Sequence, residues 1–325
     1  MGLRGPMASS SSKFDPRSLD LAVGGQAVLE GVMMRCPTAV ATAVRTPNGE
    51  IVVKRRPYVG IVNRRRLLNI PLVRGAITLV ESLALGFSSL MYSAEQALEE
   101  EAVSRDEPRL RDRLSMWGMM AFAFVFGLGL FFYLPLILAE LTGVKSGFGF
   151  NLVDGMMRLA IFMAYLLIIS RMKDMRRVFQ YHGAEHKTIH VFEHGLELKP
   201  ENARQFPTLH PRCGTSFLFF VMFVSILVFL FMGRPEGVVE RLQRLTLVPL
   251  IGGIAYEVIK LSGKYSERAW IKPLIWPGLM LQKITTKEPS DEQVEVAMAA
   301  LNSVLEESAL DLASRTVLEL AESPS

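Results

Sequence analysis

The sequence has little cysteine and no apolar leader. Only two of its 325 residues are cysteines, Cys36 and Cys213. They lie far apart in the chain, which does not suggest a disulfide framework and makes a reducing compartment the default expectation. The first twenty residues are polar and rich in serine, without the apolar core of a secretory signal peptide. A short plastid transit peptide is the alternative, and we expect residues 1–23 to be disordered.

An excess of charge of one sign is also lacking, because 36 basic and 32 acidic residues leave a formal net charge of +4. That charge is uneven. Between residues 286 and 325, nine acidic residues stand against Lys287 and Arg315, so the rest of the chain is clearly basic. Half of all residues are apolar and the mean hydropathy is positive. We therefore expect a lipid bilayer with anionic lipids as a partner, and no nucleic acid.

Long apolar segments predict a polytopic membrane protein that is mainly α, with about four transmembrane helices. A span needs about 20 apolar residues. The candidate spans are residues 116–141, 152–170, 214–232 and 245–261. The last is the weakest, since it contains Gly252, Gly253 and Glu257. Together they define a four-helix membrane domain over residues 116–285.

Lysine and arginine set the expected orientation of these spans. Residues 171–213 contain eight of them, whereas the loops 142–151 and 233–244 contain one and three. The positive-inside rule then places the histidine-rich loop 171–213 and both termini in the cytoplasm. We expect a multi-pass protein of the bacterial cytoplasmic (inner) membrane, with a plastid membrane as the second choice.

Residues 67–97 form an apolar helical pattern whose relation to the membrane is open. The segment suits an amphipathic helix on the surface, a re-entrant helix or an additional span, and we favour a membrane-associated helix that does not span. Arg74 and Glu81 are seven residues apart, hence on one face. We expect them to pair with each other or with polar groups of a neighbouring helix.

Two segments outside the membrane have recognisable patterns. Residues 38–56 predict a β-hairpin around the Asn48–Gly49 turn, within a small cytoplasmic segment 24–66. Residues 286–325 predict an acidic C-terminal helix and tail, which opens with a capping box from Ser290 to Gln293. This helix should pack on the protein itself or on a partner.

The five histidines all lie between residues 182 and 210. His182, His186, His190 and His194 are spaced by four, so each drifts by about 40° from the last around a helix. Neighbouring pairs can share a metal ion, but four cannot converge on one. We expect His182 and His186 to be the ligand pair. Glu185 completes the order H-x-x-E-H, in which the glutamate is a general base.

A histidine pair alone leaves a metal ion short of ligands. His210 and Cys213, in HPRCG, are the next candidates, because imidazole and thiolate are both good ligands for zinc (Zn²⁺). Lys187 or Arg212 would then steady an oxyanion or a phosphate. The alternative is an interfacial helix whose histidines bond lipid headgroups or backbone carbonyls.

Six separated blocks of the chain resemble a known family. They are GGQAVLEGVMMR (24–35), IPLVRGAITLVESLALG (70–86), YHGAEHKTIH (181–190), HPRCGTSFL (210–218), AYEVIK (255–260) and PGLMLQKITTKEP (277–289). The chain is similar to the YqhQ-like family of uncharacterised bacterial and plastid membrane proteins, often labelled predicted metal-dependent enzymes. The matching positions are Gln26, Glu30, Arg74, Glu81, His182, Glu185, His186, Lys187, His210, Arg212, Cys213 and Glu257.

The polar matches outside the histidine cluster have two readings each. Glu257 faces an interior or a cavity, or it pairs with Lys260. Gln26 and Glu30 line the same cavity, or they cap and anchor a short helix. Gly252 and Gly253 permit close helix contact within the chain, in a homo-oligomer or with another membrane protein.

Two hypotheses of function follow. The first is a metal-dependent integral membrane hydrolase with a cytoplasmic His/Glu/Cys site. The second is a membrane assembly or scaffold protein without enzymatic activity, serving membrane-protein biogenesis or lipid organisation. In the second, the cluster is a structural staple or a polar helix face.

Overall fold

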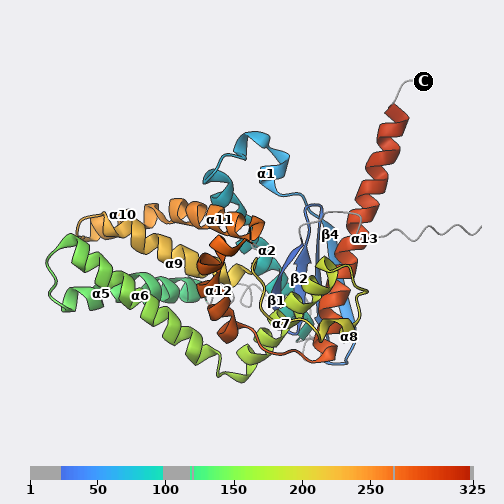
Figure 1. The fold of residues 1–325 in the computed structure, drawn as a ribbon, viewed down its shortest axis with the longest axis horizontal. Helices are drawn as coiled ribbons and strands as arrows, with labels where there is room; N and C mark the ends of the chain where they lie inside the picture. Colours follow the sequence, from blue (N-terminus) through green and yellow to red (C-terminus); the bar gives the residue numbers. More distant parts are fainter. Residues whose placement is uncertain (1–22, 98–117, 119–120, 266–267, 323–325) are drawn as a thin grey trace, which may run out of the picture.

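The computed structural model describes residues 23–97, 118, 121–265 and 268–322 (Figure 1). Three predicted features lie wholly or partly outside these residues: the disordered N-terminus 1–23, the beginning of the first span at residue 116 and the end of the C-terminal tail. Within the described part, the chain is mainly helical with a small antiparallel sheet near its beginning.

The sheet has four antiparallel strands in chain order: β1 (Gly24–Val28), β2 (Gly31–Arg35), β3 (Ala39–Arg45) and β4 (Ile51–Pro57). The predicted hairpin is β3–β4, and Gly49 lies in its turn with φ +86°. The prediction of a hairpin was incomplete, because β1 and β2 extend it to a sheet. Gln26 lies in β1 and Glu30 in the turn after it, so the alternative of a short helix there was wrong.

Helices cover both faces of the sheet. On one face, α7 (Lys173–Glu193) and α13 (Asp291–Glu322) share an apolar core with the strands, in which Met34, Tyr181 and Leu301 are buried. On the other face lies α2 (Val73–Ala97), whose Ser89 accepts a hydrogen bond from Thr42 at 3.0 Å. Alternate strand residues point to opposite faces, and in the central strands β2 and β3 both sets are buried. We call β1–β4, α7 and α13 the sheet unit.

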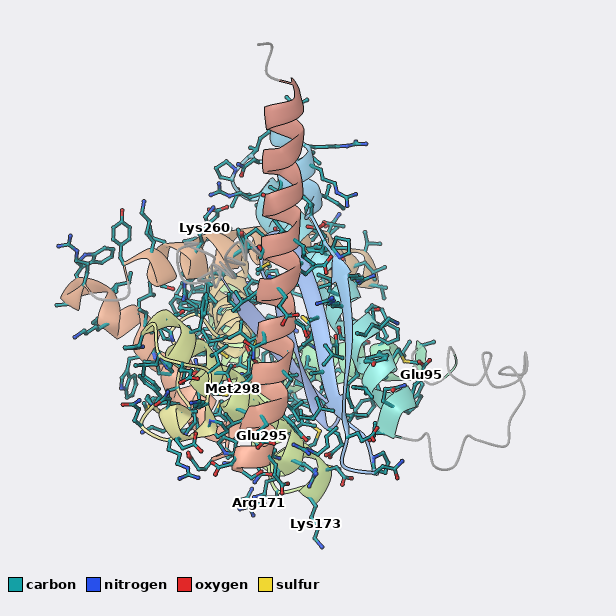
Figure 2. All side chains as sticks on the ribbon, turned by 90° about the vertical axis from the view of Figure 1, so that its right-hand side faces the viewer. Glu95, Arg171, Lys173, Lys260, Glu295 and Met298 are labelled. Atoms are coloured by element: carbon teal, nitrogen blue, oxygen red, sulfur yellow. The ribbon has the colours of Figure 1, made fainter. Side chains whose placement is uncertain are left out.

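Apolar burial holds the acidic helix α13 on this sheet, and ion pairs at the surface accompany it. The basic strand residues Arg45 and Arg55 pair with Glu295 at 3.2 Å and Glu306 at 3.0 Å. The predicted capping box is present, since the Ser290 N–H donates to Gln293 Oε1 at 3.0 Å. Figure 2 shows α13 running lengthwise over the sheet, with Glu295 and Met298 in its first part, and then continuing beyond it.

We call the helices in residues 121–169 and 214–285 the membrane bundle. It holds most of the long apolar helices. Four helices are long and apolar enough to cross a bilayer: Val73–Ala97, Ala121–Leu141, Gly147–Ile169 and Val238–Lys264. The helix Ala121–Leu141 contains the π-helix η3 (Gly129–Tyr133) and α5 (Leu134–Leu141). The helix Gly147–Ile169 is α6, and Val238–Lys264 comprises α10 (Val238–Thr246) and α11 (Val248–Lys264). The predicted span 214–232 becomes the shorter apolar helix α9 (Gly214–Leu230). α12 (Lys272–Thr285) packs against α9 and α6.

The remaining elements are short connectors. They are α1 (Ile61–Arg64), η2 (Arg66–Leu68), α8 (Pro200–Ala203) and η4 (Ala269–Ile271).

The helix α2 joins the bundle to the sheet unit. Its first half packs on α11 so closely that a Cβ on Gly75 would lie 2.9 Å from Gly253 Cα. In its second half, Leu85 packs on Met33 and Val40 of the sheet, and the small residues Gly86 and Ser89 also lie against it. Length and hydropathy allow α2 to span a bilayer, so its predicted non-spanning character stays a prediction.

Candidate metal centre

The helix α7 places the predicted histidine pair on one face. Its sequence runs from Lys173 to Glu193, and it ends where Gly195 adopts φ +67°. Gly183 lies directly against the backbone carbonyl of Lys287, where no larger side chain has room. This close approach holds α7 against the segment after α12 and fixes which way His182 and His186 point.

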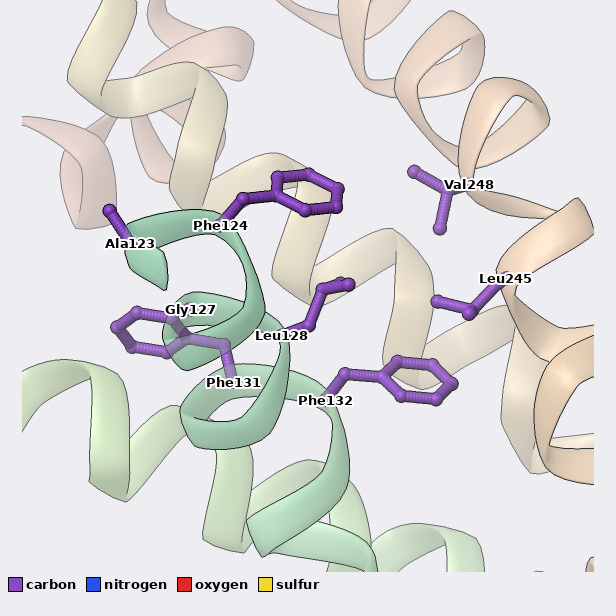
Figure 3. A pocket seen from close by; sticks show the side chains of 8 residues that line it. All are labelled: Ala123, Phe124, Gly127, Leu128, Phe131, Phe132, Leu245 and Val248. Atoms are coloured by element: carbon purple, nitrogen blue, oxygen red, sulfur yellow. The ribbon is translucent and has the colours of Figure 1, made fainter. Parts of the chain in front are cut away.

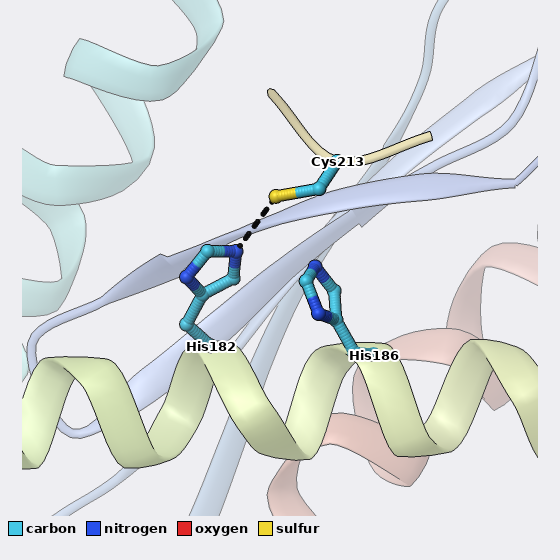
Figure 4. A group of neighbouring side chains, drawn as sticks. All are labelled: His182, His186 and Cys213. Carbon is cyan, nitrogen blue, oxygen red and sulfur yellow. Dashed lines mark hydrogen bonds between the residues drawn. The ribbon is translucent and has the colours of Figure 1, made fainter. Parts of the chain in front are cut away.

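Cys213 completes a three-residue group with these histidines. His182 Nε2 lies 3.2 Å from Cys213 Sγ, and the ligand atoms of His182, His186 and Cys213 all lie within 4.8 Å of one another. Figure 4 shows both rings on α7 turned toward the thiol, which comes from the residue just before α9. His186 and Cys213 are 1% and 5% exposed.

Backbone carbonyls hold the far nitrogen of each ring. His182 Nδ1 lies 2.8 Å from the carbonyl oxygen of Thr285, and His186 Nδ1 lies 2.5 Å from that of Thr208. A carbonyl can only accept, so each Nδ1–H donates and each Nε2 keeps its lone pair. Metal-binding histidines in proteins are typically oriented in this way.

The electrostatics favour the protonation states that bind metals. Burial raises the pKa of the Cys213 thiol, but its interactions with the His186 ring and with Thr215 act the other way, so the pKa lies below its ordinary value. Burial lowers the pKa of His186, which keeps that ring neutral. Thiolate and neutral imidazole are the forms in which these side chains act as ligands.

One separation in this group is close to that of two ligands of one zinc ion. Zinc–nitrogen distances of about 2.0 Å and zinc–sulfur distances of about 2.3 Å place ligand atoms roughly 3.5 Å apart. The separation of 3.2 Å between His182 Nε2 and Cys213 Sγ is close to this. Two nitrogens and one sulfur leave a fourth position open, as in catalytic rather than closed structural sites.

Glu185 lies beside this group and faces β1. Its carboxylate accepts a hydrogen bond from the Gly25 N–H, and a Cβ on Gly25 would come within 2.9 Å of its Cγ. Burial raises the pKa of Glu185 to about 7, with the charge of Cys213 adding to the rise and His182 opposing it. The predicted general base is thus buried next to two of the three candidate ligands.

His210 belongs to a second, adjacent group. His190, Glu193 and His210 offer ligand atoms within 4.8 Å of one another, and His210 Nε2 lies 3.3 Å from Glu193 Oε2. The His186 and His210 ring centroids are 5.7 Å apart. The structure therefore brings Cys213, but not His210, to the pair on α7, and it gives a place to His190, which the spacing argument had set aside. The predicted role of His210 as a metal ligand stays a prediction.

The two predicted cationic residues have other partners. Lys187 is 3% exposed and pairs with Glu288. Arg212 pairs with Glu193 in the second group. Neither belongs to the first group, and their predicted contact with an oxyanion stays a prediction.

Arg74, Glu81 and Glu257 lie away from the histidines. Arg74 Nε donates to Glu257 at 2.6 Å, so the expected pairs of Arg74 with Glu81 and of Glu257 with Lys260 were wrong, whereas a partner on a neighbouring helix was correct. Glu81 instead accepts from the Ile61 N–H at 2.7 Å. These contacts connect α2 with α11 and α1.

Gln26 and Glu30 are separate from each other. The Gln26 side chain packs on Gly86 of α2. Glu30, at φ +50°, accepts hydrogen bonds from Arg177 and Tyr181 of α7. The cavity that they were expected to share stays a prediction.

Gln282 is a residue that the sequence reasoning missed. It is fully buried on α12, accepts from the His210 N–H at 2.8 Å and donates to the His210 carbonyl at 2.9 Å and to Ser216 at 3.0 Å. It therefore fixes the HPRCG loop that carries Cys213. Its signal was an amide in the otherwise apolar stretch GLMLQ.

The fold and the site define a polytopic membrane protein with a small antiparallel sheet and a buried His/Cys cluster. The chain belongs to the family described as "Protein of unknown function (DUF1385)", whose model matches residues 70–307. It is 36% identical over 306 residues to "Uncharacterized protein YqhQ" of Bacillus subtilis (strain 168), covering 89% of this chain and 94% of that protein. The predicted resemblance is thus confirmed. No solved structure matches the chain.

Proposed function

We propose that the protein is a zinc-dependent hydrolase embedded in the membrane, with His182, His186 and Cys213 as the metal ligands. The observation that supports this most strongly is the convergence of three ligand atoms within 4.8 Å, with both histidines tied to carbonyls through Nδ1. A zinc ion in this set supplies Lewis acidity and activates a water molecule at neutral pH.

Glu185 acts as the general base. Its carboxylate is buried beside His182 and Cys213 and oriented by the Gly25 N–H. It takes the proton of the attacking water and passes it to the leaving group, as the glutamate of the H-x-x-E-H order does. The Gly25 backbone thus has a positioning role.

The substrate is a peptide or a lipid headgroup presented at the membrane surface. α7 follows α6 after a short turn, and Cys213 directly precedes α9, so the ligands sit where the bundle meets the sheet unit. With the excess of basic residues in 171–213 facing inward, this surface is cytoplasmic, both termini are cytoplasmic and anionic lipids lie beside it.

Metal content tests the centre itself. We expect the protein purified in detergent and resupplied with zinc to hold about one equivalent by mass spectrometry. His182→Ala/His186→Ala should hold none. His194→Ala is the matched control, since His194 is exposed at the end of α7 and should leave the metal in place. Equal metal in all three proteins, or none in any, would contradict the centre.

A Glu185→Gln variant tests catalysis separately from metal binding. We expect it to retain zinc and fold, but to fail to replace the wild-type protein in cells and to accumulate the uncleaved substrate. Full cellular function with metal retained would remove the hydrolase and leave the metal.

A structural role is the second candidate, favoured by the burial of the ligand set. The three ligands and the Thr285 carbonyl connect α7, the start of α9 and the end of α12. In this role the protein is an assembly or scaffold protein, and the metal holds the sheet unit against the bundle. Removal of the metal would then unfold this junction, and Glu185→Gln would be fully active.

A further inference from the structure

Another group of buried polar side chains, which we call the bundle group, lies inside the membrane bundle. Asp154 and Arg158 of α6 and Arg244 of α10 are 1%, 8% and 1% exposed. Arg158 Nη2 donates to Asp154 Oδ2 at 2.9 Å, and Arg244 Nη1 lies 3.9 Å from the same oxygen. Two guanidinium groups therefore share one carboxylate, which leaves an excess of one positive charge.

Several polar atoms of this group have no hydrogen-bond partner among the described residues. They are Arg244 Nη1, Arg158 Nε and Asp154 Oδ1. Buried ionic groups are costly unless their hydrogen bonds are complete, and charges within a membrane domain usually mark a functional site. Two of these three atoms are guanidinium donors, the groups that bind an anion, and the third is a carboxylate oxygen.

Aromatic rings surround the guanidinium groups. The Arg158 Cζ lies 5.7 Å from the centroid of Phe132 and 5.4 Å from that of Phe229, and the Arg244 Cζ lies 5.0 Å from the Phe229 centroid. These rings stabilise the cations and place an apolar wall around them. An anion that reaches them has to be attached to something apolar.

An apolar groove of about 400 Å³ shares Phe132 with this wall. Figure 3 shows it between the span Ala121–Leu141 and the junction of α10 with α11; its lining includes Phe124, Leu128, Phe131, Phe132, Leu245 and Val248. Phe132 lines the groove and also packs on Arg158, and Leu245 follows Arg244 directly. The π-helix η3 supplies both Phe131 and Phe132, and such helices are frequent at functional sites.

We propose that this groove binds an acidic phospholipid, with an acyl chain along the phenylalanines and the phosphate on Arg158 and Arg244. Guanidinium groups match phosphate oxygens with paired, charge-assisted hydrogen bonds. The position of the two guanidinium groups along the bundle also suits a lipid headgroup. Arg244 Nη2 bonds Asn151, in the second turn of α6, and the carbonyl of Gly233 in the loop, so the cations lie near one end of the bundle.

The lipid site is independent of the proposed metal centre. Cys213 precedes the first residue of α9 and Gly233 follows its end, so about 25 Å of helix separates the two groups. Loss of metal should leave lipid binding unchanged.

Gly127 offers a way to close the groove without touching a charge. It lines the groove, and a Cβ added there meets nothing within 4 Å. Gly127→Leu should therefore fold, fill the groove and exclude the acyl chain, whereas Gly127→Ala is the small control. Arg244→Gln removes one phosphate contact. Its charge control is Arg204→Gln, which removes an exposed cation that pairs with Asp291 at the start of α13.

The test is native mass spectrometry of the full chain in detergent with phosphatidylglycerol, phosphatidylcholine, oleate or inorganic phosphate. We expect one retained phosphatidylglycerol, about tenfold weaker retention in Arg244→Gln from the loss of a charge-assisted contact, and none in Gly127→Leu. Gly127→Ala and Arg204→Gln should behave as wild type. Equal retention in every variant, or equal binding of phosphatidylcholine or oleate, would overturn the proposal. So would phosphate alone binding as tightly as the lipid.

Discussion

The histidine group around His182, His186 and Cys213 and the bundle group of Asp154, Arg158 and Arg244 differ in how completely their hydrogen bonds are made. In the histidine group, both Nδ1 atoms reach carbonyl oxygens, and Gln282 satisfies both backbone groups of His210. In the bundle group, Arg158 Nε and Arg244 Nη1 have no hydrogen-bond partner among the described residues.

This difference corresponds to two kinds of ligand. A metal site needs free lone pairs in a rigid frame, and here the Nδ1 atom of each candidate histidine ligand is held by a carbonyl. An anion site needs free donors, and their cost in the empty state is recovered only when the anion arrives. The four predictions that follow test this contrast, beginning with the largest expected effect.

Removing the carboxylate of the bundle group should be the most damaging change. Asp154→Asn leaves two buried guanidinium groups without a counter-charge, and we expect a loss of about 3–5 kcal/mol in stability. Unfolding in detergent, followed by circular dichroism, measures this. Glu185→Gln is the comparison in the histidine group and should lose far less. Equal losses would remove the contrast.

Metal removal should destabilise only the histidine group. With zinc at about a thousandfold its Kd, binding contributes about 4 kcal/mol, which chelation removes. We expect the unfolding temperature of wild type, but not of His182→Ala/His186→Ala, to fall with a chelator. A similar fall in both proteins would mean that the chelator acts elsewhere.

Gln282→Leu should weaken the frame of the histidine group. The substitution leaves the N–H and the carbonyl of His210 without partners, at about 1–3 kcal/mol for each buried group. Zinc affinity should fall with it, because Cys213 lies on the same loop. Metal titration of the variant beside Lys283→Leu on the same helix checks this; unchanged affinity would exclude a positioning role for Gln282.

Tyr181 should give the smallest effect, visible at high pH. Burial, assisted by the charge of Glu30, raises the pKa of Tyr181 above its ordinary value of 10.0. Above pH 10 the unfolded chain releases the phenolic proton while the folded chain keeps it, so stability falls. Tyr181→Phe should lack this part of the fall. Parallel stability curves between pH 8 and 11 would contradict it.

The sequence predicted what depends on local spacing. Four-residue steps put His182 and His186 on one face, and the nearby HPRCG supplied Cys213. It also predicted the β3–β4 hairpin, because Asn48–Gly49 is a strong turn signal. The β1–β2 turn was missed because Leu29 and Glu30 give no such signal. Glu30 adopts a positive φ, and Arg177 and Tyr181 of α7 hold its side chain there.

What could not be predicted depends on contacts between distant segments. Arg74 meets Glu257 across helices, and Arg244 meets Asp154 in the same way. Nothing in the local spacing of either pair indicates the partner, since the pairing is set by helix packing. The sequence suggested that His210 joins Cys213. It lies instead with Glu193, because the packing of distant segments sets its position.

The position of α13 on the sheet has a consequence for synthesis. The strands emerge first from the ribosome, yet the helix that completes their apolar core starts at Asp291, after every bundle helix has been made. At about 5–20 residues per second, the nascent strands wait for tens of seconds. A chain that stops before Asp291 lacks the second of the two helices that cover this face of the sheet.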